Sequence, residues 1–197
     1  MDVELEAWDA WHPRFVADRL TGLELPWCVA GGWAIDLFLG AETRVHDDLE
    51  IAVPADRFED IAARFPDHEF FAVGAGTVTP ANPESLLATH QTWAREPATG
   101  KWRFDVFREP HDGVVWVCRR DPAIRLPYTE VIAHTPDAVP YLVPEIVLLF
   151  KAKGPRPKDE ADLRAVLPHL SASRRDWLIN ALDRVHPGHP WQPLLRT

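Results

Sequence analysis

Two carboxylates one residue apart could hold a metal ion at the start of a short apolar segment. Asp48 and Glu50 alternate with apolar residues, and in a strand such alternation points both acids to one face. Two neighbouring anions repel each other unless a cation lies between them, and Mg²⁺ prefers oxygen ligands of this kind. The pair therefore predicts a metal site, although the same spacing also occurs on solvated edge strands.

A double glycine upstream could seat the phosphates of a nucleotide. Gly31 and Gly32 lie between a predicted strand at 27–30 and a predicted helix at 34–39. Without a Cβ, this backbone can approach a phosphate closely, and the N–H groups at the start of a helix favour an anion. Alone, the two glycines could mark only a tight turn. Together with the acidic strand, they supply both halves of a site for a magnesium-bound nucleotide.

The stretch from the glycines to the acids resembles the signature of the aminoglycoside and lincosamide nucleotidyltransferases, which belong to the polymerase-beta-like nucleotidyltransferase superfamily. The matching residues are Gly31, Gly32, Trp33, Ala34, Ile35, Asp36, Gly40, Thr43, Arg44, His46, Asp48, Leu49, Glu50 and Ile51. The resemblance covers residues 27–55, 102–108 and 140–165. It implies an α/β (α+β) nucleotidyltransferase fold, with a mixed central sheet flanked by helices and a C-terminal helical subdomain.

Two departures from the superfamily pattern concern the acids. The second acid is Glu50, where Asp is commoner, and this moves the carboxylate outward by one methylene group. The spacing from Gly32 to Asp48 is longer than in the general superfamily, and it agrees better with the antibiotic-modifying subgroup.

A third acid completes the family pattern. Asp105 is the one acid within the otherwise apolar centre of a predicted strand at 102–108. On its own it could equally face solvent. The resemblance implies that Asp48 and Glu50 hold Mg²⁺, and that Asp105 either completes a second metal site or accepts the proton of the attacking hydroxyl. Both roles of Asp105 stay open.

The resemblance also implies a set of nucleotide contacts, and for most of them a structural alternative exists. The backbone of the two glycines would seat the β- and γ-phosphates. Arg44 could neutralise phosphate charge or lie on the surface, and His46 could contact phosphate or substrate or be structural. Lys151 and Lys158 flank a helix break, where they could contact the triphosphate or belong to a solvated basic face.

The remaining pattern predicts a mixed α/β half followed by a helical half. Apolar spacing favours a first helix over 3–20, strands near 49–53 and 68–73, and helices over 145–153, 158–167 and 173–185. We expect a catalytic domain over 1–139 and a helical subdomain over 140–197. Residues 74–101 are rich in Gly, Pro, Asn, Ser and Thr and predict a long excursion with one helical turn. The excursion supplies three residues for the acceptor: Glu84, Trp93 and Glu96.

Composition limits the partners. The formal net charge of −9 repels phosphate backbones, and no basic run compensates for it, which argues against nucleic acid. The longest apolar run, 146–150, is too short to cross a bilayer, and the acidic N-terminus lacks the features of a secretory signal. We expect a cytoplasmic protein with two buried free cysteines, Cys28 and Cys118.

The sequence thus predicts an enzyme that uses Mg²⁺ and ATP or another NTP. It would transfer a nucleoside monophosphate to a hydroxyl of a small molecule, such as an aminoglycoside or lincosamide antibiotic. Two alternatives stay open: a toxin-type nucleotidyltransferase that modifies a protein or tRNA, and a non-catalytic nucleotide-binding member of the fold. The sequence does not choose among the NTPs, nor between a monomer and a homodimer.

Overall fold

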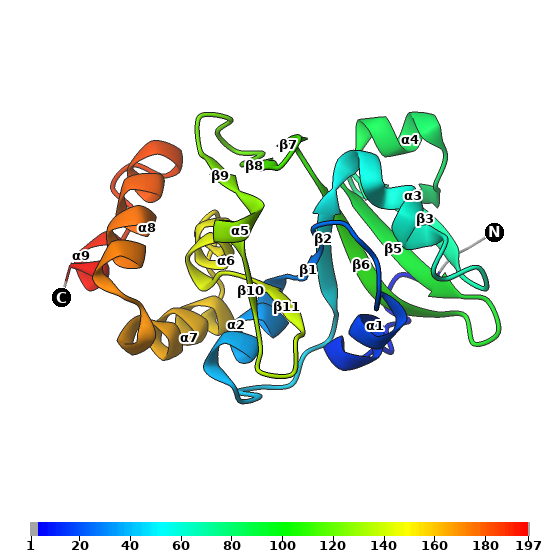
Figure 1. The fold of residues 1–197 in the computed structure, drawn as a ribbon, viewed down its shortest axis with the longest axis horizontal. Helices are drawn as coiled ribbons and strands as arrows, with labels where there is room; N and C mark the ends of the chain where they lie inside the picture. Colours follow the sequence, from blue (N-terminus) through cyan, green and yellow to red (C-terminus); the bar gives the residue numbers. More distant parts are fainter. Residues whose placement is uncertain (1–3, 197) are drawn as a thin grey trace.

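The computed structural model describes residues 4–196, and its centre is a mixed sheet of eight strands (Figure 1). The strand order is β10-β11-β1-β2-β6-β5-β3-β4. The strands of this sheet are β1 (Cys28–Val29), β2 (Glu50–Pro54), β3 (Glu69–Gly74), β4 (Thr77–Pro80), β5 (Gln91–Glu96), β6 (Lys101–Glu109), β10 (Ile132–His134) and β11 (Pro140–Leu142). A second, three-stranded sheet consists of β7 (His111–Asp112), β8 (Val115–Val117) and β9 (Arg125–Pro127).

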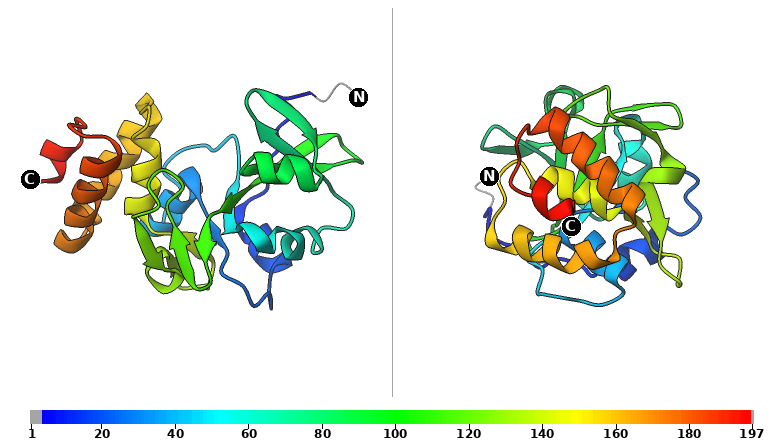
Figure 2. Two further views of the ribbon diagram at one scale, coloured as in Figure 1. Left: turned by 90° about the horizontal axis from the view of Figure 1, so that it is seen from above. Right: turned by 90° about the vertical axis from the view of Figure 1, so that its left-hand side faces the viewer.

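The helices lie around this sheet and continue beyond one end of it (Figure 2). They are α1 (Pro13–Arg19), α2 (Gly31–Leu39), α3 (Phe58–Ala62), α4 (Pro83–Ala88), α5 (Tyr128–Val131), α6 (Pro144–Lys151), α7 (Pro157–Val166), α8 (Ala172–Val185) and α9 (Gln192–Leu195), with 3₁₀ turns at Ala55–Arg57 and Leu167–His169. Helices α7, α8 and α9 gather at the end of the molecule opposite β3 and β4. None of the helices in the described part of the chain is long and apolar enough to cross a membrane.

Strands β2 and β6 run parallel at the middle of the large sheet, and their side chains alternate between two environments. Ile51, Phe104 and Val106 are fully buried on the core face. Residues one position away, including Glu50 and Asp105, project from the opposite face because side chains alternate along a strand. The alternation therefore removes the apolar residues from water and leaves the acids on the other face.

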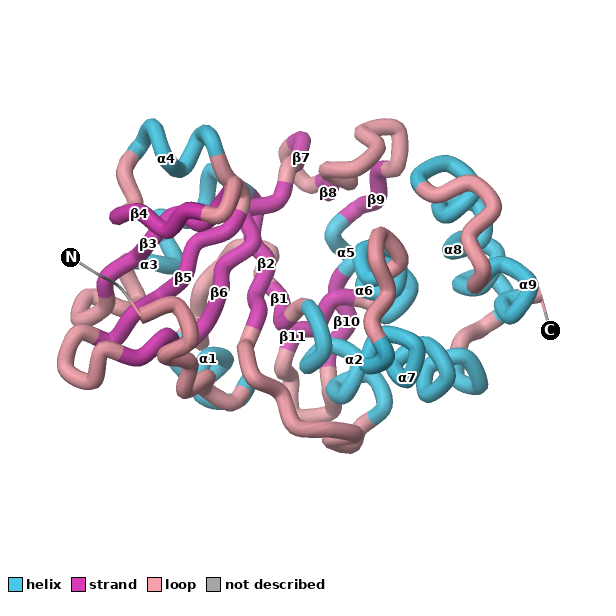
Figure 3. Tube along the Cα trace, turned by 180° about the vertical axis from the view of Figure 1, so that it is seen from behind, coloured by secondary structure: helices cyan, strands magenta, loops and turns pink. Residues whose placement is uncertain are grey.

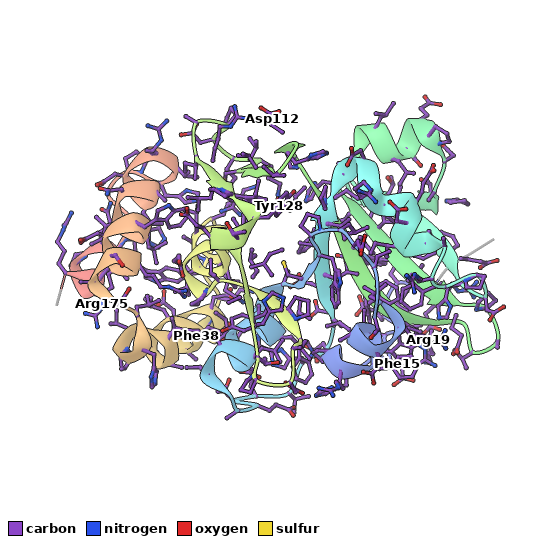
Figure 4. All side chains as sticks on the ribbon, in the orientation of Figure 1. Phe15, Arg19, Phe38, Asp112, Tyr128 and Arg175 are labelled. Atoms are coloured by element: carbon purple, nitrogen blue, oxygen red, sulfur yellow. The ribbon has the colours of Figure 1, made fainter. Side chains whose placement is uncertain are left out.

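The first helix is much shorter than the sequence predicts, and the prediction of a helix over 3–20 is wrong for residues 4–12. Proline has no N–H to donate and a φ that suits the first helical position, so the helix begins at Pro13. Upstream, Trp8 forms a β-bridge with Trp102 of β6 instead of a helical turn. Val3, the first residue of the predicted helix, lies outside the described residues. On α1 itself, Arg19 covers the ring of Phe15 at 5.4 Å (Figure 4).

The predicted excursion at 74–101 is mostly regular structure, which corrects the prediction. It contains β4, α4 and β5. Asn82 caps α4 by accepting from the Ser85 N–H at 2.9 Å, while the Ser85 side chain accepts from the Asn82 N–H. Strand β5 pairs on one side with β3 and on the other with β6. The Gly- and Pro-rich composition marks turns between short elements, which the sequence does not separate from a loop.

Other predicted elements are confirmed within a few residues. Helix α2 ends at Gly40, whose φ of 71° is left-handed, as expected of a glycine C-cap. Cys28 and Cys118 are free and buried. The division at residue 140 stays a prediction: β11 lies within the large sheet, paired with β1 and β10, and α6 packs against α2.

Candidate active site

Two of the three predicted acids face each other across the central strands. Glu50 and Asp105 are register partners in the parallel pair β2–β6, and Figure 3 shows these two strands side by side. Asp105 is 3% exposed. Asp48 precedes β2 and is exposed, although its charge still acts on Glu50. The fold therefore brings the acids of two distant segments to one place on the sheet.

Strand β5 supplies partners for Asp105 that the sequence does not indicate. The Gln91 side chain donates to Oδ2 of Asp105 at 2.8 Å, and the Thr92 N–H donates to Oδ1 at 3.3 Å. Trp93 lies directly opposite Asp105 in the β5–β6 ladder. These contacts fix the orientation of the carboxylate. Gln91 was missed because it meets Asp105 only through strand pairing.

Burial, together with the repulsion between the acids, raises the pKa values of Glu50 and Asp105. Burial, with a further contribution from Asp48, raises the pKa of Glu50 to about 7. Burial, followed by the charge of Glu50, raises the pKa of Asp105 to about 8. Both values mean that the second negative charge is unfavourable in this environment. A bound cation would remove this cost.

The acids suit a hard divalent cation in their chemistry, because all three offer carboxylate oxygens. As the side chains are placed, however, no group of three Asp, Glu, His or Cys residues within 4–196 converges closely enough to hold a metal ion. Glu50 and Asp105 are adjacent, whereas Asp48 lies outside the sheet at the edge of the site. The donor set fits, and closing it requires Asp48 to turn inward.

The glycine turn packs directly against these acids. Gly31 begins α2 with a φ of 59°, a conformation that other residues rarely adopt. A Cβ at Gly31 would overlap the carboxylate of Glu50. A Cβ at Gly32 would overlap the guanidinium of Arg44 and would lie 2.8 Å from the ring of His46. Gly31 is therefore favoured by its left-handed φ, and Gly32 by its close approach to the ring of His46, which Asp36 holds in place.

His46 is held from behind by a residue to which the sequence assigns no role. Its Nε2 lies 2.6 Å from Oδ2 of Asp36, and Thr43 donates to the other oxygen of Asp36 at 2.5 Å. The ring of His46 also stacks on Trp33, with centroids 4.3 Å apart. The His46 side chain is 1% exposed. Its position beside Gly32 is thus fixed by Asp36, a member of the matched motif.

The predicted basic residues differ in how they are engaged. Lys151 lies between Asp159 at 2.7 Å and Asp162 at 3.0 Å, and its side chain is 10% exposed. Arg44 also reaches Asp162, at 3.4 Å. Lys158 is 3.9 Å from Asp47 and remains partly exposed. Lys151 and Arg44 therefore belong to a buried ion-pair network, whereas Lys158 makes only a long, exposed ion pair.

A pocket of about 480 Å³ opens beside Gly31 and Glu50. Its apolar wall comes from the face of β2 and β6 that carries the acids and from α6. Five basic side chains and three acidic ones also line it: Arg119, Arg120, Lys151, Lys153 and Arg156, with Glu50, Glu109 and Asp159. The excess of positive charge favours an anionic ligand over a cationic one.

The three residues predicted to contact the acceptor do not line this pocket. Glu84 is exposed in the first turn of α4. Glu96 accepts from Arg103 at 2.6 Å at the far end of β5. Only Trp93 lies next to one of the acids, where it also packs against Trp8 and Trp102. The fold thus brings Trp93 to the site and leaves Glu84 and Glu96 elsewhere.

The chain is similar to known proteins in sequence. Residues 14–79 match the family described as aminoglycoside-2''-adenylyltransferase. Over 39 residues the chain is 46% identical to 2''-aminoglycoside nucleotidyltransferases of Escherichia coli and Klebsiella pneumoniae. This stretch covers 20% of the chain and spans only 22% of the length of those relatives.

Two solved structures share the fold. One is ANT(2")-Ia in complex with adenylyl-2"-tobramycin, with a TM-score of 0.58 over 86% of this chain and 94% of that one. The other is the lincosamide antibiotic adenylyltransferase LnuA with lincomycin bound, with a TM-score of 0.55 over 78% of this chain and 92% of that one. Sequence identity is 16% in both cases. The predicted fold class and the predicted family resemblance are confirmed.

Proposed function

Because the chain is related to the aminoglycoside-2''-adenylyltransferases, we propose that it transfers AMP from ATP to a hydroxyl group of a small antibiotic of the aminoglycoside or lincosamide class. The observation that carries this proposal is the Glu50–Asp105 pair on β2 and β6, packed against the Gly31 turn at the start of α2. These features would bring a metal-binding pair and a phosphate-binding turn to one side of the sheet.

In this proposal the glycine turn binds two of the phosphates, and the acids bind the metal ion that accompanies the nucleotide. The N–H groups at the start of α2 bind the β- and γ-phosphates, since a helix N-terminus favours anions. His46 and Arg44 line the same turn, and Lys158 adds positive charge at its edge. Asp48, Glu50 and Asp105 hold Mg²⁺, which when bound stabilises negative charge on the phosphate oxygens.

The reaction would proceed by attack of the acceptor hydroxyl on the α-phosphate. A new bond forms between that oxygen and the α-phosphorus, the bond to the bridging oxygen breaks, and pyrophosphate leaves. The hydroxyl proton passes to Asp105, the carboxylate that strand pairing sets beside Glu50. Gln91 orients Asp105 for this step through its hydrogen bond to Oδ2.

Incubation of the protein with Mg²⁺, each NTP and a panel of aminoglycosides and lincosamides tests the activity. We expect pyrophosphate release with ATP and at least one antibiotic, and an acceptor whose mass increases by one adenylyl group (AMP less one water). Absence of pyrophosphate release with every NTP and every acceptor would contradict the proposal. Parallel reactions with a tRNA or a protein acceptor test the toxin-type alternative. The net charge of −9 argues against a tRNA acceptor. A cytoplasmic location and a monomeric or homodimeric state stay predictions.

A further inference from the structure

Glu109 is a buried acid in the pocket that the reaction described above does not use. It lies on β6, four residues beyond Asp105 and therefore on the same face of the sheet, at about 13 Å for an extended strand. Glu109 lines the pocket but is only 4% exposed. Its Oε1 accepts from Arg119, and the Trp116 side chain also acts on the carboxylate as a donor. Its Oε2 is buried and makes no hydrogen bond of normal geometry within the described residues. A buried acceptor without a partner carries a cost that a ligand could remove.

Planar groups surround Glu109, namely a guanidinium and several aromatic rings. The guanidinium of Arg119 lies over the ring of Phe150 at 4.2 Å and over that of Phe107 at 5.4 Å. Trp116 packs edge-on against Phe150 at 6.2 Å. Guanidinium planes and aromatic rings both stack on planar ligands. This part of the pocket therefore offers stacking surfaces beside a carboxylate oxygen that makes no hydrogen bond of normal geometry within the described residues.

The charge of Glu109 is already balanced by Arg119, at a separation that allows a direct hydrogen bond. A further cation, such as an ammonium group of an aminosugar, would have to compete with Arg119 for the same carboxylate. A neutral N–H donor does not have to displace Arg119, because it needs only the lone pairs of Oε2, where the nearby Trp116 side chain makes no hydrogen bond of normal geometry. The arrangement consequently favours a planar, neutral hydrogen-bond donor over a second cation.

We infer that Glu109 reads the nucleobase of the bound triphosphate, accepting a hydrogen bond at Oε2 from the exocyclic amino group of adenine. This inference rests on the proposed function, which sets the α-phosphate beside Glu50 and Asp105. The separation of about 13 Å along β6 is comparable to the distance from an α-phosphate to the far edge of a purine. The pocket is also lined by basic side chains, which suit the phosphates of the same ligand.

Calorimetric titration with ATP, ITP and purine riboside triphosphate, each with Mg²⁺, tests the inference on the full chain. ITP carries a carbonyl where ATP carries the amino group, so it would direct an acceptor at Oε2. We expect the wild type to bind ATP at least about tenfold more tightly than ITP, because an unsatisfied buried acceptor penalises the analogue. Purine riboside triphosphate, which lacks the group, should fall between them.

The variant Glu109→Gln should reduce the ratio of ATP to ITP affinity to near one, because an amide can donate to the ITP carbonyl as well as accept. Glu145→Gln is the matched control. Glu145 is also a buried acid paired with an arginine, Arg174, but lies on α6 outside this pocket. Its substitution should leave the ratio unchanged. Circular dichroism would establish that both variants are folded.

Each outcome decides the inference. Equal binding of ATP and ITP by the wild type would overturn it and leave the proposed function intact, as would a full preference retained by Glu109→Gln. A higher Michaelis constant for the antibiotic in Glu109→Gln, with the ATP to ITP ratio unchanged, would assign Glu109 to the acceptor instead. If no triphosphate bound the wild type at all, the proposed function would fail as well. Should Glu109→Gln not fold, the wild-type comparison of the three triphosphates still decides.

Discussion

The chain buries two groups of acids within the same region, and they are in opposite electrostatic states. Asp159 and Asp162 on α7 are 1% and 3% exposed and surround Lys151, with Arg156 and Arg44 at their outer side. Side-chain hydrogen bonds from Arg156 and Lys151 outweigh the effect of burial and hold the pKa of Asp159 far below its usual range. Glu50 and Asp105 have no such cations in direct contact within the described residues, and their pKa values rise to about 7 and 8.

The contrast separates an acid that supports the fold from an acid that is available for a ligand. The α7 acids are paired with cations of the protein itself. The strand acids lie together without a cation in direct contact among the described residues, and the more distant Lys151, Arg156 and Lys158 only partly offset the rise in the pKa of Glu50. A proton or a bound cation would compensate the remaining cost. In the sequence, the acids of α7 and the acids of the strands look alike. Only the side chains around them in the fold distinguish the two groups.

The largest effect should follow from Asp105→Asn, which removes a strand acid while keeping its shape. We expect the rate of adenylyl transfer to fall at least about 100-fold, the usual size for loss of a general base. In the absence of metal the variant should be at least as stable as the wild type, because the repulsion with Glu50 disappears. Steady-state kinetics and thermal melting measure the two effects. Asp112→Asn, on the exposed β7, is the control, and it should change neither the rate nor the stability. Turnover at the wild-type rate by Asp105→Asn would show that Asp105 is not part of the site.

For the α7 acids, Lys151→Met should destabilise the fold instead. Removing the lysine leaves Asp159 and Asp162 buried with fewer partners, and breaking a buried pair in this way costs about 3–5 kcal/mol. Urea denaturation would measure the change in the free energy of unfolding. Lys153→Met, two residues later at an exposed position, should change it by less than about 0.5 kcal/mol. Equal stability of the two variants would mean that Lys151 is not a structural ion-pair partner.

The two groups should also respond to pH in opposite directions. Glu50 and Asp105 bind protons more tightly in the folded state, so their contribution to stability is present below the unfolded pKa values of about 4 and is lost as the pH rises through 7 and 8. Asp159 has a lowered folded pKa, so its contribution is present above about pH 4 and is lost as the pH falls below it. Without metal, the melting temperature should therefore fall between pH 5 and pH 8.

Added Mg²⁺ should reverse that fall, because the cation replaces the protons on the strand acids. Differential scanning fluorimetry at several pH values, with EDTA or with Mg²⁺, gives the comparison. Asp105→Asn in EDTA should show a shallower slope than the wild type. A slope that is identical in all three conditions would contradict the assignment of Glu50 and Asp105 as the coupled pair.

The smallest effect concerns Lys158, which makes only a 3.9 Å ion pair with the exposed Asp47. Lys158→Ala should change the free energy of unfolding by less than about 0.5 kcal/mol. If Lys158 contacts the triphosphate, the Michaelis constant for ATP should rise roughly two- to fivefold, the effect of one partly screened charge of about 0.5–1 kcal/mol. An unchanged Michaelis constant would leave Lys158 as a solvated surface residue.

The sequence predicts the strand-and-helix frame around the acids well, because those elements have local signals. The alternation in 49–53 and the glycine at the end of α2 are both properties of neighbouring residues. Pairing information is what the sequence lacks. The sequence predicts no partner for Asp105, because Gln91 reaches it only through the β5–β6 ladder. It also predicts a helix over residues 4–12, although Trp8 of this segment forms a β-bridge with β6.

The missing pairing information also explains why two of the three residues predicted to contact the acceptor lie away from the pocket. Glu84 and Glu96 lie in the segment that was expected to be a single excursion, but α4 and β5 carry them away from the acids. Glu109 was overlooked because nothing in its local sequence distinguishes it from an exposed strand end. Its role depends on Arg119, which lies in the turn after β8, and on Phe150 of α6. Both are brought to the pocket beside Glu109 only by the fold.

The contact between Gly31 and Glu50 has a consequence for how this sequence can diverge. The longer side chain of Glu50 occupies the volume that a Cβ at Gly31 would need, so the two positions change as one unit. An Asp at position 50 would withdraw the carboxylate by one methylene group and reopen that volume, whereas a larger residue at position 31 would first require the shorter acid. Because the φ of 59° strains any other residue at position 31 even then, a laboratory evolution experiment should give substitutions at position 50 more often than at position 31, and those at position 31 mainly in chains whose position 50 has changed.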